Sequence, residues 1–434
     1  MIITDIRVRE VAIPRIYDTY CADPKQLQHT IDHGRSRYQI IELLTNKGCV
    51  GLGEVSDISG RMKAWPAKAL QTFLLEVFRG GEVLLWRNLM DRLGEALPAD
   101  WHPELRQLTR FGVEIALLDL VGQIYNSPLY ELLGGRYRSS APVSWVAFLR
   151  GDMAREDELG ALQEEIKEKA ARGLKAFKLK VGEDHDRDLE RVRLTRTIAG
   201  AGAYIKVDAS GAWEEEEAID KVQNMAGAGA DACETPIVAV SRPIANDDPE
   251  RINSNADEVA RALARVRLRS SIPIIEHVAD LGDVFLTALI RHQAVDIINV
   301  VACQGGGIMR AQRLIQTAET AGIPALLGST IELGPGTAAF VHLAVASPNV
   351  TIPSDLVSPE LLDDDICTTP FRFAEGALRP FDKPGLGIEL DEEKMGKWHL
   401  SGARRTVLVR WQKKMIIDPN LFCCSIDLVS ETRL

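Results

Sequence analysis

The feature that most constrains the fold of this chain is a regular alternation of short apolar segments and helix-patterned segments between residues 142 and 352. The expected strands lie at 143–148, 176–181, 204–208, 230–234, 272–276, 296–301, 323–327 and 350–352. Strands that alternate with helices predict βα units and a parallel sheet. The number of units favours a closed barrel over an open sheet.

The residues on either side of this region do not continue the alternation. Residues 1–135 contain strand-like segments and then a helix-patterned stretch that ends at Gly134-Gly135. This pattern predicts an α+β domain, and a chain of 434 residues is long enough for two domains. We expect the barrel to occupy residues 136–370 and the irregular residues 371–434 to form a carboxyl-terminal segment.

The composition limits the partners and the compartment. The chain has 51 Lys and Arg and 62 Asp and Glu, so its net charge is −11. This charge disfavours nucleic acid and anionic membranes as partners. Seven scattered cysteines fit a reducing cytoplasm better than a disulfide framework. The sequence shows no signal-peptide pattern and no run of 18 apolar residues, so we expect a cytoplasmic protein. A homo-oligomer is the default expectation for a helical barrel.

Two lysines on the second expected barrel strand carry the strongest chemical signal. In the segment 176–182, Lys178 and Lys180 alternate with apolar residues, so a strand places both lysines on one face. On an exposed antiparallel strand they would be ordinary solvated lysines. In a closed barrel the face opposite the helices points inward, and two lysines there need a chemical role.

Three carboxylates follow at the carboxyl ends of the next strands, where the active sites of such barrels lie. They are Asp208, Glu234 and Glu276. Converging carboxylates repel each other unless a cation neutralises them. An all-oxygen ligand set suits Mg²⁺, or alternatively Mn²⁺, better than Zn²⁺. Each acid alone could be a helix cap or an arginine partner, and the set of three together predicts a metal site.

Further motifs extend over nearly the whole chain. They are Gly48-x-x-Gly51-x-Gly53-Glu54, Leu117-Leu118-Asp119-Leu120, Leu132-Leu133-Gly134-Gly135, Lys178-Leu179-Lys180, Val207-Asp208-Ala209, Glu234-Thr235-Pro236, Gly305-Gly306-Gly307, Glu332 and Pro384-Gly385-Leu386-Gly387. With these motifs the chain resembles the enolase superfamily, in the mandelate racemase and muconate lactonizing enzyme group. The resemblance implies a modified TIM barrel, (β/α)7β, with an α+β N-terminal capping domain on which the carboxyl-terminal segment packs.

The resemblance also implies a chemistry for the lysines. In this group a small-molecule carboxylate substrate binds the metal, and a base removes the proton α to that carboxylate. A divalent cation stabilises the resulting enediolate more than it stabilises the substrate. The matching roles make Lys180 the base and Lys178 the neighbour that lowers the pKa of Lys180 by like-charge repulsion.

Departures from the family pattern affect the expected reaction. Val301 on the sixth strand replaces the second lysine of some members, and residues 301–304 and 327–330 lack the Asp–His pair of others. We therefore expect a one-base reaction, such as β-elimination of water, rather than a two-base proton transfer. Cys303 is either a packed thiol or an opposing acid or base.

The third metal ligand also departs from the pattern. After Pro273 the expected acid comes at least one position early, as Glu276, which we take as the ligand because it keeps an all-oxygen set. Because side chains alternate along a strand, we expect His277 to face the side of the strand opposite to Glu276. His277 is then a catalytic acid on the opposite face, an alternative ligand, or a histidine that only neighbours the site.

The amino-terminal domain is expected to close the substrate pocket. The two closing loops of the family match residues 15–37 and 54–62. The polar side chains of the first loop suit a polyhydroxy or polar acid, although a solvated surface loop would have the same composition. The candidate substrate-binding residues are Tyr20, His29, His33, Arg35 and Glu332.

The main functional expectation is a Mg²⁺-dependent hydro-lyase that acts on a polar carboxylate, of the acid-sugar dehydratase type. A racemase, epimerase or cycloisomerase of the same superfamily is the alternative. Two further alternatives are a barrel whose inward lysine forms a Schiff base and a metal-binding barrel without activity.

Overall fold

The structure is a computed structural model of the whole chain. It describes residues 1–17, 19, 34–58, 62–150, 153–237, 249–278 and 282–400. Among these residues, no helix is both long and apolar enough to cross a membrane.

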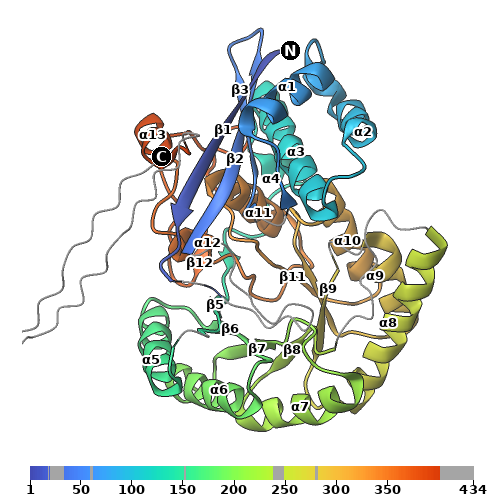
Figure 1. Cartoon of the computed structure of the whole chain (residues 1–434), viewed down its shortest axis with the longest axis vertical. Coiled ribbons are helices and arrows are strands. Elements are labelled where there is room, and N and C mark those ends of the chain that lie inside the picture. The colour runs from blue at the N-terminus through green and yellow to red at the C-terminus, as the bar shows by residue number, and fades with distance from the viewer. Residues whose placement is uncertain are drawn as a thin grey trace, which may run out of the picture. The chain divides into compact units, whose positions relative to one another are not determined.

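The amino-terminal part combines an antiparallel sheet with helices (Figure 1). The sheet has the order β1-β2-β3, and the elements are β1 (Ile3–Pro14), β2 (Arg35–Thr45), β3 (Val50–Val55), α1 (Ala67–Phe78), α2 (Trp86–Ala96), α3 (Pro103–Tyr125) and α4 (Leu129–Leu132). Helix α3 is apolar around most of its circumference because neighbours surround it. It lies directly against β3, since a Cβ on Gly53 would be 1.9 Å from the carbonyl oxygen of Gly112.

The second part is a parallel sheet of seven strands with the order β11-β10-β9-β8-β7-β6-β5. Its strands are β5 (Trp145–Ala147), β6 (Ala176–Lys180), β7 (Tyr204–Asp208), β8 (Ala232–Glu234), β9 (Ile274–His277), β10 (Ile297–Val300) and β11 (Ala325–Leu327). The connecting helices are α5 (Arg155–Ala171), α6 (His185–Ala199), α7 (Glu215–Ala228), α8 (Pro249–Arg269), α9 (Gly282–Arg291), α10 (Ile308–Thr320) and α11 (Gly334–Ala346). Figure 1 shows α5 to α8 along the outside of the sheet.

The segment 350–354 closes the sheet into a barrel. Val350 bridges to Ala325 at one edge, and Ser354 bridges to Val143 at the other. The backbone N–H of Ser144 also donates to the Ser354 carbonyl at 2.8 Å. The predicted modified TIM barrel with an α+β capping domain is therefore confirmed, and its eighth strand is reduced to isolated bridges.

One apolar layer identifies the inner face of the barrel. Strands β8 to β11 contribute its buried residues, and β7 and the closing segment add partly buried ones; the members are Ala232, Ile275, Ile297, Leu326, Tyr204 and Ile352. A layer built from successive strands in this way fills the inside of a parallel barrel. Since side chains alternate along a strand, Glu234 on β8 and His277 on β9 also face inward.

The chain after the barrel returns to the amino-terminal part. The remaining elements are α12 (Ser358–Leu361), β12 (Ala377–Leu378), which pairs with β4 (Ala141–Pro142), and α13 (Glu392–Trp398). The backbone N–H of Leu386 donates to Asp119 of α3 at 2.8 Å, and His399 bridges to Val11 of β1.

Candidate active site

The two lysines of β6 lie on the inner face of the barrel, beside the acid of the next strand. Lys180 pairs in register with Asp208 of β7, and its Nζ is 2.6 Å from Asp208 Oδ2. The Nζ of Lys178 is 2.9 Å from the same oxygen. Both ammonium groups therefore share one carboxylate, and Asp208 in turn accepts the backbone N–H of Ser210 at 2.8 Å.

Lys178 is the centre of a buried charge cluster. Besides Asp208, its Nζ is 2.8 Å from Glu234 and 3.1 Å from Asp355. Burial lowers the pKa of Lys178, but the three carboxylates outweigh burial and hold it well above its usual value. Burial likewise raises the pKa of Asp208, and the two lysines outweigh that effect and hold it well below its usual range.

Two members of this cluster were not identified from the sequence. Asp355, which follows the closing segment, accepts from Lys206 at 2.7 Å and from Lys178. Lys206 lies on the inner face of β7 and is fully buried. Lys206 lies two residues before Asp208 on the same strand, so the alternation of side chains could have placed it on the same face from the sequence. Asp355 had no comparable signal, because it lies outside any regular strand.

The third predicted metal ligand and its neighbour face opposite sides of β9. His277 pairs with Asn299 of β10, whose side-chain amide donates to the inward-facing Glu234 at 2.8 Å. Glu276 pairs with Ile298 of the main core and accepts from the Thr235 hydroxyl at 3.2 Å. The register places His277 on the inner face, the reverse of the facing expected from the sequence. The ligand role of Glu276 stays a prediction.

Glu332 is held by hydrogen bonds within its own loop and to its neighbours. The donors come from the hydroxyl groups of Ser329, Thr330 and Ser358 and from the backbone N–H of Thr330 at 2.7 Å. The thiol of Cys303 also donates to it, at 3.3 Å. These contacts fix the loop between β11 and α11, and substrate binding by Glu332 stays a prediction.

The far side of the barrel from Lys180 carries apolar groups at the strand ends. Strand β10 lies four places from β6 in the eight-membered barrel, and the buried Val301 follows its last residue. On the neighbouring strand, a Cβ at Gly328 would be 2.6 Å from Asn299 and Val301 atoms, so no side chain fits there. Burial, together with Glu332, raises the pKa of the Cys303 thiol well above its usual value, which keeps it protonated.

The predicted substrate-binding loop is described only at its ends. Tyr20, His29 and His33 lie outside the described residues, and Arg35 is exposed at the start of β2. Near the other end, the buried Arg15 donates to Asp57 of the second loop at 2.8 Å. The two loops are therefore tied together by an ion pair.

Glu54 connects the capping domain to the barrel near this site. It is fully buried at the end of β3, and it accepts the backbone N–H groups of Leu333 and Gly336 at 3.0 and 2.9 Å. Burial raises the pKa of the Glu54 carboxyl to about 8. Acceptors at a helix amino terminus complete hydrogen bonds that the helix itself cannot make, here those of α11.

The inner face offers donors suited to a divalent cation. Asp208 and Glu234 are neighbours in register, and β9 adds His277 on the same face. In the described part of the chain no three acidic, histidine or cysteine side chains converge to hold a metal ion, and Lys178 bridges the first two acids instead. The donor chemistry of these residues fits a divalent cation.

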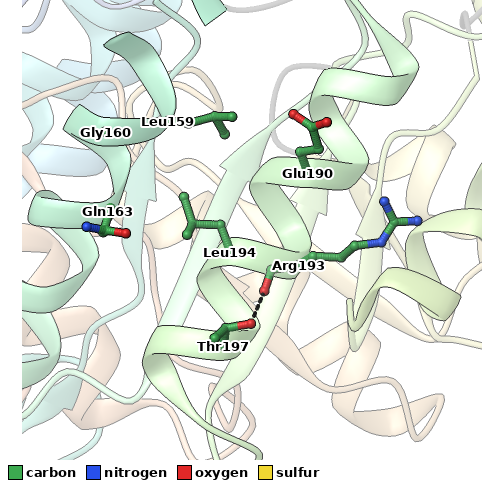
Figure 2. Close-up of a pocket in the computed structure, with 7 residues that line it drawn as sticks. All are labelled: Leu159, Gly160, Gln163, Glu190, Arg193, Leu194 and Thr197. Carbon is green, nitrogen blue, oxygen red and sulfur yellow. Dashed lines mark hydrogen bonds between the residues drawn. The ribbon is translucent and has the colours of Figure 1, made fainter. Parts of the chain in front are cut away.

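A concave feature lies on the outer surface. A groove of about 380 Å³ runs between α5 and α6, where Thr197 donates to the Arg193 carbonyl at 2.8 Å (Figure 2). It is lined by residues of these two outer helices, while the charge cluster faces the inside of the barrel. The groove is therefore separate from the candidate active site.

Comparisons with known proteins agree with this arrangement. Residues 15–134 match the family model of the mandelate racemase / muconate lactonizing enzyme N-terminal domain, and residues 161–394 match that of the enolase C-terminal domain-like family. The fold and the inner-face site define an enzyme of the enolase superfamily. The chain belongs to its mandelate racemase and muconate lactonizing enzyme group, whose members generally depend on a divalent metal.

Individual relatives include isomerases of two kinds. Muconate cycloisomerase 1-1 of Acinetobacter lwoffii is 27% identical over 386 residues, which cover 87% of this chain and 93% of that protein. N-succinyl-L-Arg/Lys racemase of Bacillus cereus is 25% identical, with 82% and 88% covered. The muconate lactonizing enzyme of Pseudomonas fluorescens, solved with muconolactone, has a TM-score of 0.76 at 26% identity, with 92% and 99% covered.

Proposed function

We propose that this protein is a divalent-metal-dependent isomerase that transfers a proton at the carbon α to the carboxylate of a small substrate, and that its reaction is a cycloisomerisation. The observation that carries the proposal is the one-sided site. Lys180 lies on the inner face beside Asp208, while the opposite strand ends present Val301 and Gly328. Among the described residues, these strand ends therefore supply no second base.

The one-sided site favours ring closure over racemisation. Racemisation removes a proton from one face of a carbon and returns it to the other, which calls for a group on each face. In a cycloisomerisation, a carboxylate oxygen adds to a conjugated C=C bond, and the electron pair moves toward the second carboxylate. The ammonium group of Lys180 then donates a proton to the α-carbon, so that one group on one face is sufficient.

The remaining residues position this chemistry. A divalent cation held by Asp208 and Glu234 would supply positive charge for the substrate carboxylate. Lys178 contacts the same two acids and is therefore placed to contact a substrate carboxylate bound beside them. The hydro-lyase reaction expected from the sequence has less support, because the named relatives are cycloisomerases and racemases.

The test is an assay of the purified protein with Mg²⁺ or Mn²⁺ and conjugated dienedioic acids in D₂O. We expect a lactone that carries one deuterium at the α-carbon, added to one face. Lys180→Ala should lower kcat by about 10²- to 10⁴-fold, the usual contribution of a general acid or base. Lys175→Ala, which changes the exposed residue just before the same strand, serves as the matched control.

Three results would contradict the proposal. Full activity of Lys180→Ala would exclude it as the proton donor. Deuterium exchange on both faces of a chiral carboxylate, without ring closure, would identify a racemase or epimerase. Release of water from an acid sugar would instead identify a dehydratase.

A further inference from the structure

We propose that His277, and not Glu276, completes the metal site of this barrel, which makes the ligand set two carboxylates and one imidazole. The inference rests on the proposed function, because it takes a divalent cation at Asp208 and Glu234 as given. It concerns which residue of β9 that cation contacts, and therefore which cation the site prefers.

The register of the sheet shows which residues of β9 face inward. Ile275 pairs with Glu234 on one side and with Ile297 on the other. Ile275 and Ile297 belong to the apolar layer inside the barrel. Because alternate residues share a face and the pairing of β9 with β10 continues without a shift, His277 lies on that inner face, one layer nearer the carboxyl ends of the strands.

A hydrogen bond that spans β9 supports the same placement. The amide of Asn299 on β10 donates to Glu234 on β8, and Asn299 is the register partner of His277. The strand between these two residues is β9, so their side chains meet over its inner face. His277 therefore lies on the strand between a predicted ligand and the amide that orients this ligand, and on the face where these two side chains meet.

Glu276 occupies the opposite face of the same strand. Its register partner is Ile298, and Ile274, two residues earlier, pairs with Cys233. Cys233, Ile274 and Ile298 all belong to the main core and not to the apolar layer inside the barrel. Glu276 is only 3% exposed, and its carboxylate accepts from the Thr235 hydroxyl. A cation on the inner face would be separated from Glu276 by the backbone of β9.

An imidazole in the ligand set changes the preferred cation. Mg²⁺ is bound almost wholly by oxygen, whereas imidazole suits later first-row metals. Mn²⁺ is the weakest binder in the affinity order of the first-row divalent metals, so a preference for Mn²⁺ over Mg²⁺ is the smallest change that an imidazole ligand should produce. We therefore expect this site to bind Mn²⁺ at least about tenfold more tightly than Mg²⁺.

The test uses metal binding and not turnover. The full-length protein, stripped of metal, is titrated with Mn²⁺ and with Mg²⁺ by calorimetry, and the Mn²⁺ complex is examined by electron spin-echo envelope modulation. We expect a nitrogen coupling from a directly bound imidazole. His277→Ala and His277→Asn should abolish this coupling and weaken Mn²⁺ binding by about 10- to 100-fold or more. His277→Asp should lower the preference for Mn²⁺ over Mg²⁺.

Glu276→Gln is the matched control on the other face of the strand. It should keep the nitrogen coupling and the affinity for Mn²⁺. A wild-type Mn²⁺ complex without nitrogen coupling would overturn the inference, as would loss of Mn²⁺ binding in Glu276→Gln but not in the His277 variants. The wild-type spectrum tests the inference without any variant, so a variant that fails to fold would not affect this result. The lactone assay with saturating Mg²⁺ tests the proposed function separately.

Discussion

Lys178 and Lys180 show how the function of a residue depends on its partners. The resemblance to the family implies that Lys178 lowers the pKa of Lys180 by repulsion. In the structure both ammonium groups contact the same oxygen of Asp208, and Lys178 also contacts Glu234 and Asp355. The carboxylates offset the repulsion. Lys178 therefore holds the acids of the site in place.

His342 provides a prediction about pH at the residue scale. It lies on α11, accepts the backbone N–H of Tyr130 at 3.3 Å and donates to the Leu386 carbonyl at 3.2 Å. Burial lowers its pKa to about 4, against the opposing effects of the Leu386 carbonyl and Asp382. In the unfolded chain the pKa returns to about 6.5. The unfolded state then binds the proton first as the pH falls.

The stability that neutral His342 contributes is therefore present above about pH 6.5 and is lost as the pH falls toward 4. The loss is on the order of 3 kcal/mol. His342→Gln should cost about 1 kcal/mol at pH 7.5 through weaker hydrogen bonds, and it should remove this part of the acid sensitivity. Urea unfolding of both proteins from pH 4 to 8 measures the difference. Parallel curves for the two proteins would refute the prediction.

At the scale of elements, the contact between α3 and β3 depends on glycine. A Cβ at Gly112 would be 2.6 Å from the Glu54 carbonyl oxygen, and Gly53 faces Gly112 at a similarly short distance. Both neighbours are backbone atoms, which cannot rotate away. The glycines in the sequence motif around Gly51 and Gly53 are therefore required because this close packing leaves no room for a Cβ.

Gly112→Ala should destabilise the protein by about 1–3 kcal/mol or more, because the helix must move away from the sheet. The control is Gly160→Ala in the exposed part of α5, where a Cβ meets no atom within 4 Å. This variant should gain about 0.5–1 kcal/mol, since alanine favours the helix. Thermal unfolding of both variants measures these effects. Equal stability of the two variants would contradict the assignment.

At the scale of the whole molecule, Glu54 connects the two domains by hydrogen bonds. Its carboxyl group belongs to β3 of the capping domain, and the N–H groups that it accepts lie at the start of α11 of the barrel. Arg15 and Asp57 tie the described ends of the two closing loops together in the same region. The capping domain is thus fixed where the barrel strands end.

Glu54→Ala should lower the stability by about 1–3 kcal/mol, because two buried N–H groups lose their acceptor. Glu54→Gln should retain most of the stability, since burial already keeps the carboxyl largely protonated at neutral pH. Glu95→Ala on the exposed face of α2 is the control and should change little. Differential scanning calorimetry compares the three. An unchanged melting temperature in Glu54→Ala would show that this contact does not join the domains.

The sequence alone determined the alternation of strands and helices and the shared face of Lys178 and Lys180. These features follow from local periodicity, which a single strand or helix expresses by itself. The sequence also shows Val301 at the position where some members of the family have a second lysine.

Only the tertiary structure decided which face of β9 points inward. Facing depends on the register with neighbouring strands, and the sequence of a short buried strand does not specify it: Glu276 and His277 are both polar residues in an apolar run. The same reason explains why Asp355 was missed. It meets Lys178 and Lys206 only because the barrel closes, which brings together residues about 150 positions or more apart along the chain.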